Sequence, residues 1–540
     1  MSDKSQSSYL TYASTLVSFV VAYCLWSIAQ WRTRSRGRPL PPGPKPLPVL
    51  GNMFDVPRSR QWISYRDLSR VYGDILHFRI FTKSYVVLNS AEAMYELLDK
   101  RTANTSDRVQ TPMIELSGSS LNLGFMPYGQ WWRRHRRYFW QHFRPEAIGP
   151  YRQTQQSAAH MFLQKLCDNP SDLRKLIHFN FIKVALKVGY DIDVDDGDDE
   201  YAKIAKEALE GPVEGLVPGK FLVEFFPSLR HIPPWFPGAT SQRLWAKWQA
   251  AGERLKNVPF SRAKAKLASG EMTDSIAARL LQRLSDRGIT SSEEEEIVKD
   301  VVAIAFEVMR AIPLVLSATL SVFSGVSLHP EVLRKAHAEL DAVVGSHRLP
   351  DFNDWDSLVY VNAIIKEALR WHTVTPLGVP HATTSDDDFR GYFIPAGTMI
   401  LPNVWACMHD PDVYEDPDVF RPERFIRDGK LDSTVQDPAA FVFGFGRRRV
   451  STRQICPGRY FAEAALFINV ACALHVFDIT QPLGEDGQPI EIKPGHTDSL
   501  ISYPEDCRCT IKPRSAAAET VIRSHATAAR QALNERTSVR

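Results

Sequence analysis

A single cysteine, Cys456, stands just before a predicted helix, in the segment ICPGRYFA at residues 455–462. A thiolate in this place faces the positive end of the helix dipole and nearby backbone N–H groups, which favour its anionic, metal-ligating form. Upstream, the segment FGFGRR at 443–448 predicts a glycine-rich turn that can approach a flat ligand closely, and its arginines can bind carboxylates. A lone buried cysteine is more often a small hydrophobic residue. Cys456 therefore becomes a candidate metal ligand only if other segments support it.

Three further segments give that support. Glu367 and Arg370, in EALR, lie three residues apart on one predicted helical face, where an ion pair can form. Trp132 and Arg136, in WWRRHRR, lie four apart and can contact one ligand group from the same helix. Arg424 lies in PERF at 422–425. In order and spacing, these segments together with the cysteine segment resemble the cytochrome P-450 family, and most of all its fungal microsomal members.

The resemblance runs from about residue 40 to residue 515 and implies the cytochrome P-450 fold, a single mainly α-helical domain with small β-sheets. It implies haem b, iron protoporphyrin IX, as the cofactor and Cys456 as the iron ligand. It also implies a set of residues that contact the haem: Trp132, Arg136, His381, Phe443, Gly446 and Arg448. For His381, a purely structural role is the alternative. The implied structural ion-pair cluster is Glu367, Arg370 and Arg424.

The implied activity is that of a membrane-anchored haem-thiolate monooxygenase of secondary metabolism. Electron donation by a thiolate ligand favours cleavage of the O–O bond, so that one oxygen atom enters a lipophilic small molecule and the other leaves as water. A chain of 540 residues leaves no room for a flavin domain beside the haem domain, which implies NADPH-cytochrome P-450 reductase as the electron donor. Candidates for its docking face, with a plain solvated helix face as the alternative, are Arg133, Arg134, Arg137 and Arg447. The implied substrate pocket draws on segments 113–125, 221–236, 374–379 and 500–502.

Composition excludes some other classes of protein. The formal net charge of +3 does not indicate nucleic-acid binding. The chain has 7 cysteines without paired spacing apart from Cys507 and Cys509, which does not indicate a disulfide framework. We therefore expect the cysteines to be reduced and the main domain to lie in the cytosol.

Residues 8–31 carry no charge and predict a transmembrane anchor. At about 1.5 Å per residue they are long enough to cross a hydrocarbon layer of about 30 Å. Four arginines follow at once, which predicts that the downstream side faces the cytoplasm and that residues 1–7 are lumenal. The expected location is the endoplasmic reticulum membrane, with membrane lipid as a partner. A cleavable signal peptide is the alternative, but the small-residue cleavage pattern is missing.

Three further segments complete the predicted organisation. Residues 32–52 are basic and rich in proline, which resists helix and predicts a stiff extended hinge. Residues 53–515 form the predicted catalytic domain. Residues 516–540 are polar and rich in alanine, and we expect a loose helix or a disordered tail.

The predicted distal helix lacks the proton-relay residues that the resemblance implies. Counting back from LHPEV at 328–332, the acid position falls on Pro313 and the hydroxyl position on Leu314, and neither side chain can move a proton. A proline inside this helix also predicts a kink. Ser317, one turn beyond, and Glu307, two turns before, are candidates for a substitute relay.

Two hypotheses on the coding sequence follow from departures of this kind. Codons for MRAIPL at 309–314 can be written so that reading from the third base gives Ala-Gly-Asp-Thr-Thr, which suggests out-of-frame translation and is testable by a transcript read.

Residues 449–454 form an insert before the cysteine, with terminal codons that can resemble intron boundaries. Closing the longer loop costs only about 0.6 kcal/mol per doubling of length, so the geometry of the turn matters more.

The same departures leave two alternatives open for the function. One is a haem-thiolate isomerase, dehydratase or peroxide user, which needs no acid and alcohol relay. The other is a non-functional haem-binding product.

Overall fold

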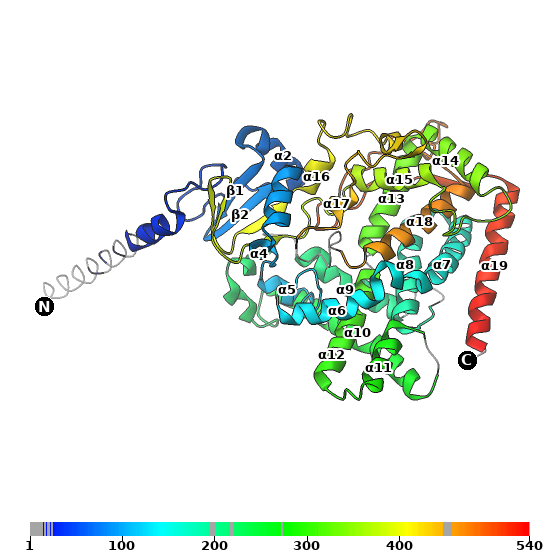
Figure 1. The fold of residues 1–540 in the computed structure, drawn as a ribbon, viewed down its shortest axis with the longest axis horizontal. Helices are drawn as coiled ribbons and strands as arrows, with labels where there is room; N and C mark the ends of the chain where they lie inside the picture. The colour runs from blue at the N-terminus through cyan, green and yellow to red at the C-terminus, as the bar shows by residue number, and fades with distance from the viewer. Residues whose placement is uncertain are drawn as a thin grey trace.

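The computed structural model describes residues 15–538 with several gaps. The residues outside the description are 1–14, 16–17, 19–21, 23–24, 195–199, 217–219, 272–273, 310–311, 447–455 and 539–540. Helices dominate the described chain, and its short strands form one four-stranded sheet and three two-stranded sheets. The expected mainly α-helical architecture with small sheets is observed (Figure 1).

The helices range from single turns to long packed helices. The α-helices are α2 (Gln61–Tyr72), α3 (Ala91–Met94), α4 (Thr102–Thr105), α5 (Pro112–Leu116), α6 (Gln130–Phe143), α7 (Gly149–Asp168), α8 (Leu173–Tyr190), α9 (Glu200–Gly215), α10 (Thr240–Ala268), α11 (Ile276–Asp286), α12 (Ser292–Met309), α13 (Ile312–Leu328), α14 (Pro330–Val343), α15 (Val359–Trp371), α16 (Val404–Met408), α17 (Ala439–Val442), α18 (Arg459–Val476) and α19 (Ala516–Ser538). A π-helical turn is η1 (Tyr95–Lys100), and the 3₁₀ turns are η2 (Pro145–Ala147), η3 (Pro170–Asp172), η4 (Leu222–Glu224), η5 (Pro227–His231) and η6 (Pro422–Phe425).

The strands lie mostly at one side of the molecule, beside α2 (Figure 1). They are β1 (Ile75–Ile80), β2 (Lys83–Leu88), β3 (His381–Ala382), β4 (Asp387–Phe389), β5 (Tyr392–Ile394), β6 (Met399–Pro402), β7 (Ile426–Arg427), β8 (Lys430–Leu431), β9 (Phe477–Thr480) and β10 (Thr510–Pro513). The four-stranded sheet has the order β1-β2-β6-β3, and only the β2–β6 pair is parallel. This sheet joins β6 and β3, from the last third of the chain, to β1 and β2 near its start.

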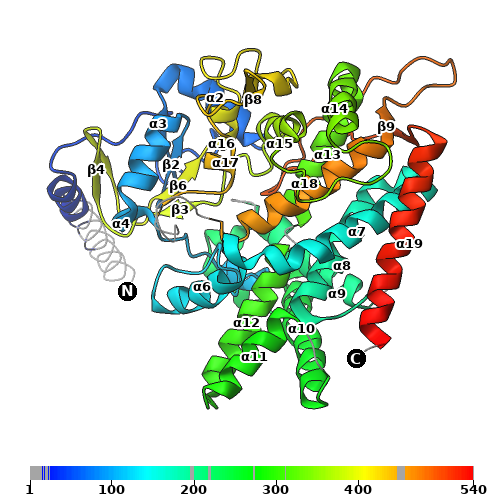
Figure 2. The same cartoon turned by 45° about the vertical axis from the view of Figure 1, so that its right-hand side comes forward.

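Helix α18 lies at the centre of the helical part of the molecule. It contacts α7, α13, α14 and α15, and Figure 2 shows it between α13 and α7. Its sequence is apolar around nearly the whole circumference, which is typical of a helix buried on all sides. Within the described residues it is the one helix long and apolar enough to cross a membrane, but 78% of it is buried inside the protein, so it is a core helix.

The structure describes the predicted distal helix in two parts, α12 and α13. The residues between them, 310–311, lie outside the description. Pro313 is the second residue of the described range of α13. The predicted kink therefore falls beside residues 310–311, outside the described residues, and stays a prediction.

Most of the predicted membrane segment lies outside the described residues. Within 8–31 the structure describes Thr15, Ser18, Ala22 and 25–31, and these residues are helical and exposed. The described helix continues to Ser35 and extends away from the body of the molecule (Figure 1). These residues leave the anchor unconfirmed.

The basic and proline-rich segment after this helix is attached to the domain. Arg34 pairs with Asp386 at 2.6 Å, just before β4. The carbonyl oxygen of Pro42 accepts a hydrogen bond of 2.8 Å from the His77 N–H in β1. The stiff spacer expected for 32–52 thus lies against the sheet along part of its length.

Helix α19 packs along α7, as both ribbon views show (Figures 1 and 2). Ile522 and Ala526 of α19 are fully buried. Arg523 pairs with Asp168 at 3.2 Å across the two helices. The segment for which a loose helix or disorder was expected is therefore a packed helix.

Candidate functional site

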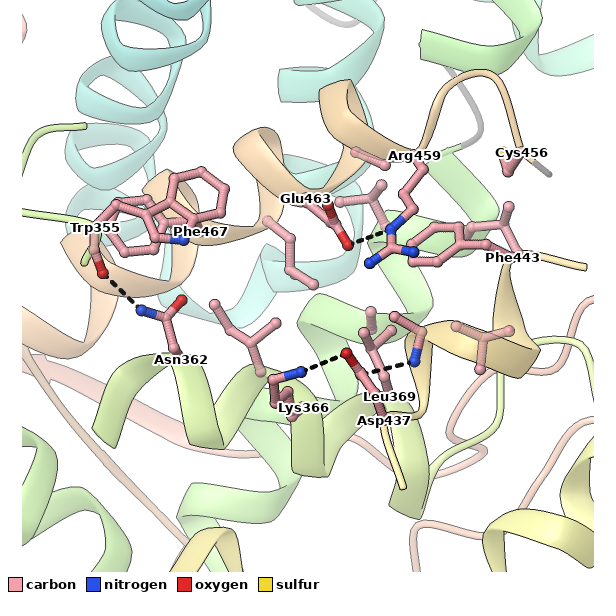
Figure 3. A pocket seen from close by; sticks show the side chains of 18 of the residues that line it. Trp355, Asn362, Lys366, Leu369, Asp437, Phe443, Cys456, Arg459, Glu463 and Phe467 are labelled. Atoms are coloured by element: carbon pink, nitrogen blue, oxygen red, sulfur yellow. Dashed lines mark hydrogen bonds and ion pairs between the residues drawn. The ribbon is translucent and has the colours of Figure 1, made fainter. Parts of the chain in front are cut away.

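A cavity of about 540 Å³ lies between α13, α15, α17 and α18. One side is lined by the apolar residues Leu314, Val315 and Ala318 of α13, and Cys456 lies at its edge (Figure 3). Of the four segments predicted to line a substrate pocket, one contributes here, through Val374. The cavity thus combines an apolar wall with a single thiol, within the part of the chain that the structure describes.

Cys456 immediately precedes the turn that leads into α18, as predicted. Its carbonyl oxygen accepts a hydrogen bond of 3.2 Å from the Arg459 N–H. The side chain is only partly exposed, and burial is the largest effect on its pKa, which it raises. The Gly458 N–H, Arg136 and Arg459 act in the opposite direction. The predicted stabilisation of the thiolate by backbone and positive charge is present, but in the protein alone the desolvation of the thiol outweighs it.

Two ion pairs form the polar side of the cavity (Figure 3). Arg459 pairs with Glu463 at 2.7 Å, and its guanidinium lies 5.2 Å from the ring centre of Phe443. Lys366 pairs with Asp437 at 2.8 Å. Burial raises the pKa of the Glu463 carboxyl, which Arg459 opposes. Sequence reasoning missed both pairs, although the i,i+4 spacing of Arg459 and Glu463 on a helix was a readable signal.

The two haem-contact candidates on α6 lie outside the cavity lining. The Trp132 indole N–H donates to the Leu123 carbonyl oxygen at 3.2 Å, and the Arg136 guanidinium lies 5.8 Å from the centre of the Trp132 ring. Burial lowers the pKa of Arg136 to about 10, and the Cys456 sulfur opposes that shift. Arg136 is therefore a buried cation close enough to act on the cysteine, and an added carboxylate would stabilise it.

His381 and Gly446 also lie outside the cavity lining. The His381 ring contacts the Thr105 carbonyl oxygen through Nδ1 at 2.8 Å. The Gly446 N–H donates to the Asp99 carboxylate at 2.8 Å, and its φ of 86° lies in the left-handed region. A Cβ at Gly446 would lie 2.9 Å from a backbone oxygen, so this turn requires glycine. The remaining candidate, Arg448, and the insert 449–454 lie outside the described residues.

The predicted ion-pair cluster is assembled and buried. Arg370 donates to both oxygens of Glu367 at 2.7 and 2.8 Å, and both side chains are 0% exposed. Arg424 approaches the same carboxylate at 3.2 Å. Arg370 also donates to the carbonyl oxygen of Met408 at 3.0 Å and to that of Pro417 at 2.7 Å. The cluster therefore ties α15 to the loops that lead towards the cysteine.

The candidates for a substitute relay are engaged elsewhere. The Ser317 hydroxyl donates to the Ser502 carbonyl oxygen at 2.6 Å and is fully buried. The Glu307 carboxylate accepts a hydrogen bond of 2.9 Å from the Asn122 amide. Leu314, at the predicted hydroxyl position, lines the cavity with an apolar side chain. None of these three described residues presents a proton donor to the cavity lining.

The residues present fit a haem. A flat macrocycle needs apolar faces, one axial ligand and cations near its carboxylates. The structure offers α13 as an apolar face, Cys456 as a sulfur ligand and Arg136 as a buried cation near that sulfur. Phe443 and Leu314 join Cys456 at the cavity, whereas Trp132 and His381 hold hydrogen bonds to backbone oxygens nearby.

Comparison with known proteins points to one family. The family model described as Cytochrome P-450 matches residues 41–505. Cytochrome P-450 monooxygenase COX2 of Coprinopsis cinerea is 38% identical over 491 residues, covering 91% of this chain and 92% of the relative. Cytochrome P-450 monooxygenase 98 of Postia placenta is 37% identical, with 93% and 95% covered. The tryptamine 4-monooxygenase of Psilocybe cyanescens is 35% identical, with 93% and 97% covered.

Proposed function

Because this chain belongs to the cytochrome P-450 family, we propose that it is a membrane-anchored monooxygenase that inserts one oxygen atom of O₂ into a lipophilic small molecule. Proteins of this family are oxidoreductases that bind haem b. The observation that carries the proposal for this chain is the placement of the Cys456 thiol at a cavity with an apolar wall. A haem bound through cysteine supplies the reductive cleavage of O₂, in which two electrons and two protons leave the second oxygen atom as water.

The protein residues bind and orient the cofactor. In this proposal Cys456 is the iron ligand, Phe443 lies beside it, and Arg136 neutralises a haem carboxylate. Trp132 supports Arg136 from the same helix. We propose haem contacts for the other candidates as well, which are His381, Gly446 and Arg448. Glu367, Arg370 and Arg424 hold α15 against the loops around the cysteine.

The lining of the cavity supports a lipophilic substrate. Leu314, Val315, Ala318 and Val374 present hydrocarbon groups only. Such a wall excludes water and gains free energy from apolar ligand surface, at roughly 25 cal/mol per Å² buried.

Exposed apolar residues support the proposed attachment to the endoplasmic reticulum membrane. Val49 is 80% exposed, Phe54 68% and Trp235 78%. Phe81 contacts both parts of the chain: its ring lies 5.5 Å from the Phe225 ring, centre to centre, and its backbone N–H donates to the Leu50 carbonyl oxygen at 3.2 Å. Together with the uncharged segment 8–31 and the arginines after it, they support an anchored domain that faces the cytoplasm.

The proposed electron donor is NADPH-cytochrome P-450 reductase. Arg133 and Arg137 are exposed on α6, the helix that carries Trp132 and Arg136. Exposed cations of this kind attract an acidic partner surface.

The test is the absorption spectrum of the full chain, expressed in microsomes and reduced under carbon monoxide. We expect a Soret band at the long-wavelength position typical of thiolate ligation. Cys456→Ser should abolish this band, whereas Cys167→Ser, at a partly buried thiol on α7 remote from the cavity, should leave it unchanged. An unchanged spectrum in the first variant would contradict the proposal.

Leu314 favours one second candidate, a haem-thiolate enzyme that needs no proton relay, such as an isomerase, dehydratase or peroxide user. The apolar side chain stands where a hydroxyl would serve an oxygenase. The two functions differ in their requirements. Product formation that depends on NADPH and the reductase supports the monooxygenase, and turnover without either supports the second candidate.

A further inference from the structure

Three polar side chains from α6, α10 and α12 meet in the interior, away from the cavity. His135 contacts the Asp300 carboxylate through Nε2 at 3.2 Å, and Lys256 pairs with the same carboxylate at 2.6 Å. The side chains of His135, Lys256 and Asp300 are 0%, 9% and 3% exposed. Lys256 also pairs with Glu296 nearer the surface. We call His135, Lys256 and Asp300 the buried triad.

The hydrogen bonds of His135 are directional. Its Nδ1 lies 3.0 Å from the Trp131 carbonyl oxygen, and its Nε2 faces Asp300. Both partners carry acceptor oxygens, so one orientation of the ring serves both contacts. The Asp300 carboxylate is thus contacted by the His135 ring and by the Lys256 ammonium, and Glu296 is the second carboxylate on Lys256.

Stability alone gives no reason for this arrangement. Removing charges from water is costly, and apolar replacements of a buried ion cluster are often neutral or stabilising. Conversely, a charged cluster accepts only one relative placement of its helices, while apolar side chains tolerate several. A triad on three helices is therefore well suited to fix their register.

The register in question is that of α6. Trp132 precedes His135 by three residues and Arg136 follows it, and all three are buried. Any rotation or sliding of α6 that breaks the His135–Asp300 contact moves Arg136 relative to Cys456. A displacement of about 1 Å in a binding residue is enough to weaken a preorganised site.

We propose that the buried triad is a positioning device that locks α6 onto α10 and α12 and so holds Trp132 and Arg136 in place for the haem. The role for the haem rests on the proposed function. The constraint on the position of α6 relative to α10 and α12, which we call the lock, is a property of the folded chain. It can be measured without the cofactor.

The first test compares Asp300→Asn with Glu293→Gln in the full chain. Glu293 also connects α12 to α6, through Arg134, but its side chain is 57% exposed, so it is a matched surface control. Hydrogen exchange of the α6 amides should become faster in Asp300→Asn and stay unchanged in Glu293→Gln. Equal exchange in both variants and the wild type would overturn the lock.

The second test measures the release of haem to an acceptor protein. We expect Asp300→Asn to release haem roughly tenfold faster or more, as for other residues that orient a metal site from outside it. Unchanged release, with faster exchange in α6, would overturn the positioning role. If the wild-type chain binds no haem, the proposed function fails, and the lock is judged by the exchange result alone.

A third variant separates positioning from folding stability. The combined change His135→Phe, Lys256→Met and Asp300→Leu fills the same space with apolar groups and should unfold at no lower temperature than Asp300→Asn. We expect its haem release to stay roughly tenfold faster than in the wild type. Release as slow as in the wild type would show that packing alone positions α6, and would overturn the proposal.

Discussion

At the scale of single residues, Glu367 is a buried carboxylate held by several donors. It is fully buried and accepts from Arg370, Arg424 and the Arg421 N–H. Glu367→Gln leaves Arg370 without a charged partner, and breaking a buried pair costs roughly 3–5 kcal/mol. We expect a clearly lower unfolding temperature by calorimetry. Glu415→Gln, at the 81% exposed partner of Arg421, should change it little, and equal effects would contradict the assignment.

Leu314 allows a direct test of the missing relay. Leu314→Thr places a hydroxyl at the cavity wall, where it can hold a proton donor or a water near bound oxygen. We expect the yield of product per NADPH to rise by roughly tenfold, less than the 10²–10⁴ typical of complete acid–base catalysis, because Pro313 still occupies the acid position. Leu314→Val, which has the shape of threonine without the hydroxyl, is the control. Similar yields in the two variants would exclude a relay at this position.

Residue patterns predicted contacts within one helix better than contacts between segments. The Glu367–Arg370 pair follows from helical spacing and is observed. The Arg424 contact came from the family resemblance, because no local rule connects residues 57 positions apart. The buried triad was missed because His135, Lys256 and Asp300 belong to three helices and show no common spacing.

At the scale of elements, α19 makes a specific stability prediction. Ile522 is fully buried against the helical core, so Ile522→Ala should remove about 2–5 kcal/mol of stability. The exposed neighbour Ser524 gives the control Ser524→Ala, for which no measurable change is expected. Denaturant unfolding compares them. If Ile522→Ala is neutral, α19 does not contribute to the folded domain.

Two helices were expected from the motif segments and are observed. The helix after Cys456 is α18, and the helix that carries Trp132 and Arg136 is α6, where both side chains are buried. The packing of the tail 516–540 was harder to predict, because only a few apolar residues of α19 are buried. The kink predicted at Pro313 falls beside residues 310–311, which the structure does not describe, so it stays a prediction.

At the scale of the whole molecule, the interior depends on neutral histidines. Burial lowers the pKa of His77, His142, His160 and His496 to about 4. In the unfolded chain a histidine titrates near pH 6.5. Between these values the unfolded chain binds more protons than the folded protein, so stability must fall as the pH falls.

This linkage predicts a steep acid destabilisation. Each of the four histidines contributes up to about 1.4 kcal/mol per pH unit between roughly pH 6.5 and 4, and nothing above that window. We expect the unfolding temperature to be level from pH 8 to 7 and to drop progressively from pH 6.5 to 4.5. His160→Phe, which removes one of the four, should make the slope shallower, whereas His231→Asn, at an exposed position, should leave it unchanged. A stability that is constant or rises on acidification would show that these rings are charged in the folded protein, because only a group already protonated there binds no extra proton on unfolding.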